Sequence, residues 1–104
     1  MEKRLSDLSK YELEQEIRAL HERKRKAEQM GMVSEIEVVL RRIAIAESYL
    51  VDPKSFKPGA TYIVNYNDRP FRLKFVNGVM GWGTFEGETT EHAIPLSELS
   101  EVKA

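Results

Sequence analysis

The spacing of hydrophobic residues changes near the middle of the chain. Up to Asp52 they recur every three or four positions, as on one face of a helix, whereas after Pro58 they alternate with polar residues, as in a half-exposed strand. All four prolines and five of the six glycines follow Asp52. The pattern predicts an α+β protein with helices in residues 1–52 and strands in residues 53–104.

Two helix starts carry the capping-box signature, a serine followed three positions later by a glutamate. Ser9 with Glu12 marks the first helix and Ser34 with Glu37 marks the second. Gly31 lies between them and supplies the left-handed backbone that often ends a helix. The short connection predicts an antiparallel hairpin. The stripes expected to face each other are Leu13, Ile17, Leu20, Ala27 and Met30 in the first helix, and Ile36, Leu40, Ile43 and Leu50 in the second.

The second predicted helix has a wider apolar face than the first. Val39, Ala44 and Ala46 extend its stripe, so we expect this helix to contact more than one neighbour. It is expected to end near Val51, because Asp52 precedes a proline and is disfavoured in α-helical backbone.

Two turn signals predict the register of the strands. Asn77-Gly78 favours a two-residue type I′ turn, which pairs Phe75 with Met80 and Leu73 with Trp82. A four-residue loop over residues 67–70 gives a compatible register for the preceding hairpin. The predicted core face consists of Tyr62, Val64, Tyr66, Phe71, Leu73, Phe75, Met80 and Trp82. The predicted opposite face consists of Ile63, Asn65, Arg72, Lys74, Gly81 and Gly83.

The last part of the chain adds a short strand at "HAIPL", residues 92–96, with Pro95 at a sheet edge, and a closing turn at "LSEL", residues 96–99. Four or five short strands joined by tight turns are typical of a small SH3-like barrel. We therefore expect an N-terminal antiparallel helical hairpin packed, as one compact unit, on a C-terminal antiparallel SH3-like β-barrel.

Six motifs along the chain are specific in combination. They are "MEKR" at the start, "RKAEQMG" at 25–31, "SYLVDP" at 48–53, "PGATY" at 58–62, "NGVMGWG" at 77–83 and "AIPLSEL" at 93–99. In these motifs the chain resembles the YfhH-like proteins of Bacillus-type bacteria over nearly its whole length. The resemblance implies an SH3-like barrel with an N-terminal helical hairpin. It implies no assigned activity and no known catalytic or binding residues.

Composition argues against several classes of function. Sixteen Lys and Arg against 17 Asp and Glu give a net charge of −1, which supplies no overall field for nucleic acid. Cysteine is absent, and His21 and His92 are too far apart in sequence to form a metal motif. The first ten residues lack the apolar core of a signal peptide, and no apolar run reaches the about 20 residues that span a bilayer. We expect a cytoplasmic protein without metal, cofactor or small-molecule ligand.

The predicted outward face of the strands carries a candidate partner-binding surface. Arg72 and Lys74 lie there beside Gly81 and Gly83, whose missing side chains would let a phosphate backbone or an acidic peptide approach closely. Arg69 adds a third cation. Alternatively, the glycines only permit the strong coiling that a small barrel requires.

Trp82 is the second candidate. An exposed tryptophan between two glycines would form a stacking platform for a base or a proline-rich peptide. The predicted register instead places it in the core beside Leu73 and Phe75.

No arrangement of residues indicates catalysis. A hydrolase centred on His92 rests only on the polar loop before it, and we do not expect an enzyme. The favoured hypothesis is a non-enzymatic interaction module that binds a protein partner or forms a homodimer through the second helix. The alternative is RNA or DNA binding through Arg69, Arg72 and Lys74 with the glycine strip.

Overall fold

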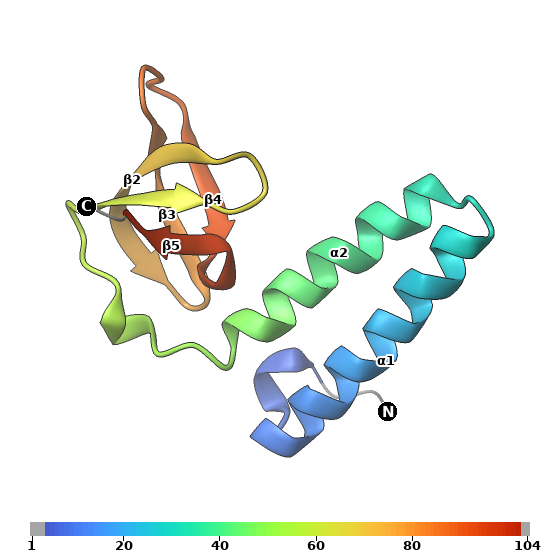
Figure 1. The fold of residues 1–104 in the computed structure, drawn as a ribbon. Helices are drawn as coiled ribbons and strands as arrows, with labels where there is room; N and C mark the ends of the chain where they lie inside the picture. Colours follow the sequence, from blue (N-terminus) through green and yellow to red (C-terminus); the bar gives the residue numbers. More distant parts are fainter. Residues whose placement is uncertain (1–3, 103–104) are drawn as a thin grey trace. The chain divides into compact units, whose positions relative to one another are not determined.

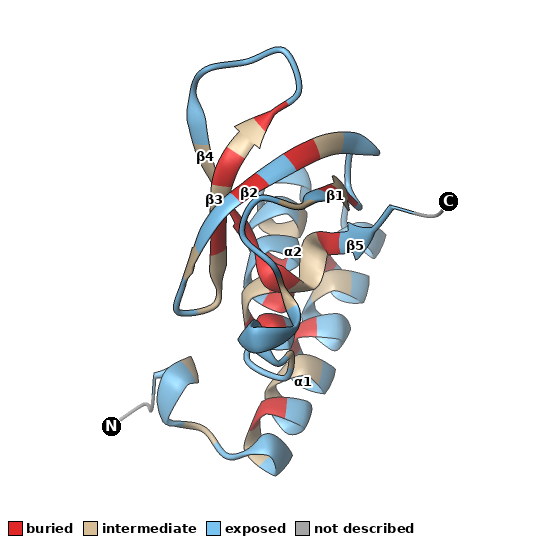
Figure 2. Ribbon diagram, turned by 90° about the vertical axis from the view of Figure 1, so that its left-hand side faces the viewer, coloured by how far each residue is buried: buried red, intermediate tan, exposed pale blue. Residues whose placement is uncertain are grey.

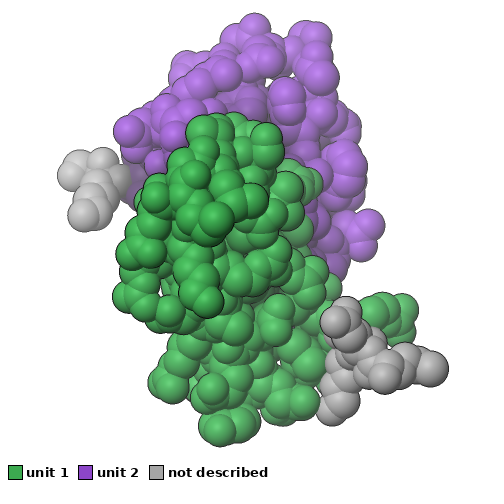
Figure 3. Space-filling model, turned by 90° about the vertical axis from the view of Figure 1, so that its right-hand side faces the viewer, with its two compact units in different colours: residues 1–50 green, residues 51–104 purple. Residues whose placement is uncertain are grey.

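Helices occupy the first half of the chain and strands the second, which confirms the predicted α+β class (Figure 1). The computed structural model describes residues 4–102. The ends of the two predicted domains, residues 1–3 and 103–104, lie outside the described residues. The chain divides into a helical unit, residues 1–50, and a strand unit, residues 51–104, each with its own core (Figure 3).

The helical unit contains a single-turn helix η1 (Leu5–Asp7) and two long helices, α1 (Lys10–Gln29) and α2 (Val33–Ser48). The capping box at the start of α1 is confirmed. The Ser9 hydroxyl accepts a hydrogen bond from the Glu12 amide at 3.2 Å, and the Glu12 carboxylate accepts one from the Ser9 amide at 3.1 Å. Gly31 follows α1 with a φ of +66°, as its position predicts.

The second predicted capping box was wrong. The Met32 amide bonds to the Ala27 carbonyl, and the chain re-enters helical conformation at Val33, so Ser34 already lies inside the first turn of α2. Met32 is the N-cap and provides no side-chain cap. The other end of α2 also differs from the prediction, because the helix stops at Ser48 rather than near Val51.

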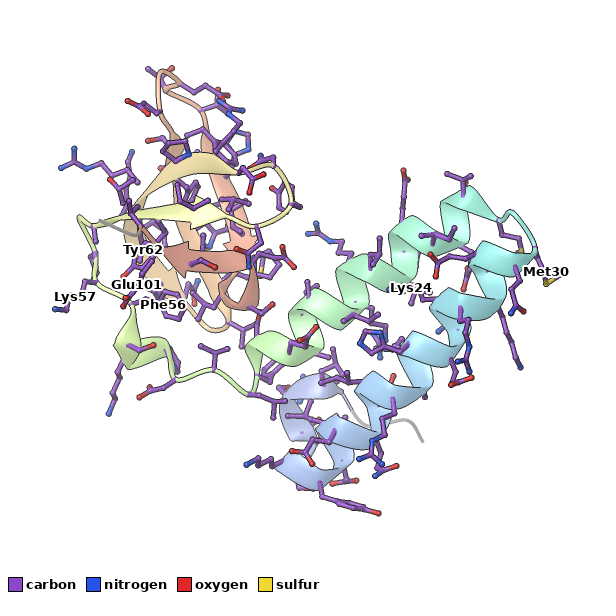
Figure 4. All side chains as sticks on the ribbon, viewed as in Figure 1. Lys24, Met30, Phe56, Lys57, Tyr62 and Glu101 are labelled. Atoms are coloured by element: carbon purple, nitrogen blue, oxygen red, sulfur yellow. The ribbon has the colours of Figure 1, made fainter. Side chains whose placement is uncertain are left out.

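The core of the helical unit uses only part of the predicted apolar face of α2, namely Ile43 and the residues Val39 and Ala46 that were expected to extend the stripe. Leu20 of α1 packs with Val39, Ile43 and Ala46, which follow helical spacing but start one position before Leu40. Leu40 is exposed as a result, and Leu50 lies beyond the helix end. Met30, predicted to be in the stripe of α1, projects from the tip of the hairpin (Figure 4).

The strand unit forms one antiparallel sheet in the order β4-β3-β2-β1-β5. The strands are β1 (Thr61–Val64), β2 (Arg69–Asn77), β3 (Met80–Phe85), β4 (Glu91–Pro95) and β5 (Leu99–Glu101). The predicted fourth strand, with Pro95 at an edge, is confirmed. The sheet is open rather than a closed barrel, because the turn η3 (Leu96–Glu98) carries the chain from one edge strand to the other without pairing them (Figure 1).

The first strand hairpin is shorter than predicted but keeps the predicted faces. Its loop is residues 65–68, so Tyr62 pairs with Phe71 and Val64 with Arg69. The observed pairing differs from the predicted one by an even number of residues, and the side chains of both strands therefore stay on the predicted side of the sheet. Tyr66, predicted in the core, lies in the loop and is 63% exposed. The core of this unit consists of Tyr62, Val64, Phe71, Leu73, Phe85, Ile94, Leu96 and Leu99.

A segment before β1 closes one side of this core. The Tyr62 hydroxyl accepts a hydrogen bond from the Lys57 amide at 2.8 Å, and the Phe56 ring lies 5.5 Å from the Tyr62 ring (Figure 4). Leu73 of β2 exchanges backbone hydrogen bonds with Gly59 and Ala60. This segment thereby extends the antiparallel pairing of β2 beyond β1.

The turn between β2 and β3 lies one residue later than predicted. Asn77 pairs with Met80, so the turn residues are Gly78 and Val79, and only Gly78 has left-handed backbone, with a φ of +62°. This change moves the partner of Phe75 from Met80 to Trp82, a shift of two residues, so by itself it leaves the side chains of β3 on the predicted side of the neighbouring strand. The faces predicted for β3 were nevertheless wrong, because a bulge in β2 changes the pairing again and places Leu73 opposite Gly83: Gly81 is turned inward and Trp82 outward.

The backbone of β2 requires this orientation of β3. Gly81 and Gly83 are buried, alternating with partly exposed neighbours along the strand (Figure 2). A Cβ atom on Gly83 would collide with the carbonyl oxygen of Arg72, whereas one on Gly81 would lie 2.9 Å from the Leu73 Cδ1 atom. Gly83 thus allows close backbone contact within the sheet, Gly81 leaves room for leucine side chains of the core, and the two glycines do not form an exposed strip.

A bulge in β2 moves a predicted core aromatic residue to the other face. The pairing shifts between Leu73 and Phe75, so Lys74 and Phe75 are both exposed, and Val76 returns toward the core. The prediction of Phe75 as a core residue was therefore wrong, and it pairs with Trp82 on the outside.

Gly83→Ala is expected to destabilise the strand unit by at least about 2 kcal/mol, because rigid backbone stands in the way of the new methyl group. Gly81→Ala is the matched control and should cost less, since the end of a leucine side chain can move. Urea unfolding followed by Trp82 fluorescence measures both losses. Equal losses would contradict the close contact at Gly83.

Ser9→Ala is expected to lower the stability of the helical unit by about 1 kcal/mol, because one amide at the start of α1 loses its acceptor. Ser34→Ala removes the same hydroxyl from a position that caps nothing and should change stability by only a few tenths of that amount. Thermal unfolding followed by circular dichroism at 222 nm compares the two variants. A larger loss for Ser34→Ala would restore the capping box predicted there.

Candidate interaction surface

The outward side of the central strands carries a stacked aromatic pair. Phe75 of β2 and Trp82 of β3 are cross-strand partners whose ring centroids lie 6.1 Å apart with an interplanar angle of 6°. Phe75 is 45% exposed and Trp82 is partly exposed. We call these two residues the aromatic platform. It exists because the bulge and the inward glycines turn both rings away from the core.

Two of the three predicted cations of β2 are engaged by carboxylates. The Arg69 guanidinium lies 2.6 Å from the Glu88 carboxylate, and the Lys74 ammonium lies 3.8 Å from that of Glu91. Within residues 4–102, no carboxylate forms an ion pair with the third cation, Arg72. Arg72 and Lys74 are exposed farther along β2, whereas Arg69 at the start of the strand lies on the side of Phe71 and Leu73, where its guanidinium covers the edge of the core at Phe85. Most of the charge of these three residues is already balanced.

A hollow of about 350 Å³ lies beside Arg72 on the strand unit. Thr61 and Thr84 are the direct cross-strand neighbours of Arg72 in β1 and β3, so the three side chains form one row across the sheet. The other lining residues are Pro70, Phe85, Glu86, Gly87 and Glu88. The hollow thus combines a guanidinium and two hydroxyl groups with the turn after β3.

Arg69 also holds the loop that borders this hollow. Its guanidinium lies 4.5 Å from the centre of the Phe85 ring, and the His92 ring meets the same phenyl group edge-on at 5.1 Å. The second oxygen of Glu88 is 3.7 Å from Nε2 of His92, a contact that becomes an ion pair when the imidazole is protonated. The side chain of Arg69 is therefore committed to the fold.

The hydrogen bond from Arg69, supported by its charge, lowers the pKa of the Glu88 carboxyl below its ordinary value of 4.5. Partial burial opposes this shift, and His92 adds to it. The polar loop around His92 thus forms an ion-pair cluster. In the part of the chain that the structure describes, no group of three or more His, Asp or Glu side chains is arranged to hold a metal ion.

The sequence analysis missed the aromatic platform, although a signal for it is present. Glycines inside a strand often mark the close approach of another backbone, and this would have turned Gly81 and Gly83 inward and Trp82 outward. The prediction instead assumed that the pairing runs without a bulge from the turn at Asn77 to Arg72. Whether Arg69, Arg72 and Lys74 bind a partner stays a prediction.

The arrangement of two helices followed by an open five-stranded antiparallel sheet defines a small α+β protein. None of the helices within residues 4–102 is long and apolar enough to cross a membrane. The chain belongs to the family described as "Protein of unknown function (DUF1811)", which matches residues 3–100.

One relative in Bacillus subtilis (strain 168), "Uncharacterized protein YfhH", is 41% identical over 102 residues, which cover 97% of this chain and 98% of that protein. The resemblance to YfhH-like proteins is thereby confirmed. Neither description names an activity, so the function has to be argued from the surface itself.

Replacing Arg69 by Gln is expected to raise the pKa of Glu88, because its main hydrogen-bond donor is lost. The pKa of Glu88 is lowered in the folded state, so its contribution to stability is complete above the unfolded value near 4.5 and is lost as the pH falls through the folded value. A carboxyl-carbon NMR titration measures the shift. Lys74→Gln is the control, since Lys74 pairs with Glu91; a wild-type Glu88 that titrates above 4.5 would contradict the cluster.

Proposed function

We propose that the chain is a non-enzymatic protein-interaction module that binds its partner on the aromatic platform. The observation that carries this proposal is the exposure of Phe75 and Trp82, which stack on each other outside a core with its own aromatic residues. Exposed aromatic side chains are enriched at the centres of protein interfaces, where they bury a large area at a low cost in conformational entropy. The platform lies on central strands, so a rigid sheet holds it.

The charges around the platform favour a protein partner over nucleic acid. A surface that binds a phosphate backbone needs several unneutralised cations. Here Arg69 and Lys74 are paired with Glu88 and Glu91, and the whole chain has a net charge of −1. Nucleic-acid binding remains the second candidate, because Trp82 is suited to stack on a base and no carboxylate of residues 4–102 forms an ion pair with Arg72.

A second copy of this chain is another possible protein partner. Val33 and Leu40 are exposed and seven positions apart, which places them on the same side of α2. Val38 is also exposed but lies on a different side, so the exposed apolar stripe is narrow. The aromatic platform is therefore the better supported surface.

We further propose an SH3-like assignment for the strand unit. The five-strand antiparallel order, with a single 3₁₀ turn leading into β5, supports it. The absence of cysteine supports a cytoplasmic location.

Phe75→Ser is expected to weaken partner binding by about tenfold or more, because half of the platform is removed. The fold should be retained, since the Phe75 side chain is already largely outside the core. The measurement is quantitative affinity purification of the full chain from its native cell, with and without nuclease treatment. Tyr66→Ser is the matched control, because it removes an exposed aromatic residue from the loop after β1.

We expect the wild type and Tyr66→Ser to retain the same specific proteins, and Phe75→Ser to lose them. Nuclease treatment should not change which proteins are retained. Retention that disappears with nuclease would favour nucleic-acid binding instead. Retention of the same proteins by Phe75→Ser would remove the platform from consideration. A mass measurement by light scattering at high micromolar concentration reports separately on self-association.

A further inference from the structure

The row formed by Thr61, Arg72 and Thr84 is an unused set of hydrogen-bond donors. Arg72 lies in the middle, and directly opposite residues in antiparallel strands have Cβ atoms about 5 Å apart. The two threonines therefore flank Arg72, and all three residues line the hollow of about 350 Å³. No hydrogen bond or ion pair joins the Arg72 guanidinium to another side chain of residues 4–102. Such a row is suited to receive oxygen atoms of an anion.

The remaining groups of the hollow limit the charge of that anion. Glu88 is neutralised by Arg69, but Glu86 also lines the hollow and brings a negative charge. Arg72 supplies one positive charge, which a singly charged carboxylate balances, whereas a doubly charged phosphate group would leave an excess negative charge beside Glu86. A carboxylate also matches the planar guanidinium, which can donate two parallel hydrogen bonds to its two oxygens.

The hollow and the aromatic platform lie side by side along the same strand. Thr84 and Trp82 are two residues apart in β3 and lie on the same outward face, a separation of about 7 Å. An extended peptide has the same spacing between alternate side chains. One extended segment is therefore able to place a carboxylate in the hollow and an apolar side chain on the platform at the same time.

We propose that the partner presents an extended segment in which one residue lies between an acidic residue and an apolar residue. This inference rests on the proposed function. The carboxylate is held by Arg72 with Thr61 and Thr84, while the apolar side chain contacts the aromatic platform. Charge complementarity at Arg72 identifies the partner class as an acidic and apolar peptide segment of a protein.

The test compares two peptides that differ in one charge, acetyl-Thr-Glu-Thr-Leu-Thr-amide and its Gln counterpart. Each is titrated into the isotope-labelled full chain, and NMR follows the indole N–H of Trp82 and the side-chain N–H of Arg72. We expect the Glu peptide to shift both signals and to bind about fivefold more tightly than the Gln peptide. In Arg72→Gln the two peptides should bind equally well. Lys54→Gln, which removes the same charge outside the hollow, should keep the fivefold difference.

The outcomes separate this inference from the proposed function. Equal binding of both peptides at Trp82 would overturn the carboxylate site and leave the aromatic platform intact. No shift of the Trp82 signal with either peptide at millimolar concentration would count against both. A preference that persists in Arg72→Gln would assign the carboxylate to another cation. Inorganic phosphate that binds at Arg72 more tightly than the Glu peptide would also overturn the inference, in favour of a free anion.

Discussion

The close contact between the backbone of β2 and Gly83 is the constraint on which the surface of the strand unit depends. No side chain fits between Gly83 and the Arg72 carbonyl group, so this buried position of β3 has to be a glycine. Alternation along β3 places Gly81 inward as well and sends Trp82 outward. A tryptophan within a central strand thereby becomes part of the surface.

The bulge in β2 completes the same arrangement from the other strand. Without it, Leu73 and Phe75 would share a face, and Trp82 would have no aromatic partner. With it, Phe75 stacks on Trp82 while Val76 packs against the core. Buried glycines in one strand and an extra residue in the next thus act together: they remove bulk from the core side and place two aromatic rings on the other.

The three basic residues of β2 differ in how their charge is balanced. Arg69 is held by Glu88 and lies over Phe85, so its charge stabilises the loop after β3. Lys74 is balanced more weakly by Glu91 at 3.8 Å. Arg72, which lies between them in β2, lines the hollow together with Thr61 and Thr84. Among the three cations of β2, the charge of Arg69 and Lys74 is therefore balanced by carboxylates, whereas no carboxylate of residues 4–102 forms an ion pair with Arg72.

The sequence by itself determined the features that depend on local backbone. The change in hydrophobic spacing identified helices and strands, Ser9 and Glu12 placed the start of α1, and Gly31 placed its end. The register predicted for the first strand hairpin was wrong by an even number of residues. Tyr62, Val64 and Phe71 nevertheless lie in the core as predicted, because side chains of a strand return to the same face every two residues.

Only the tertiary structure decided which face of β3 is exposed. The Asn77-Gly78 signal predicts a hairpin, but the faces were exchanged by the bulge between Leu73 and Phe75, which the turn signal does not reveal. The choice was made by contacts between strands, above all the absence of space for a Cβ atom at Gly83. For the same reason the facing stripe of α2 was set by packing against Leu20 rather than by its pattern alone. The candidate site consists of residues whose direction is set by such long-range contacts, and local sequence signals do not contain that information.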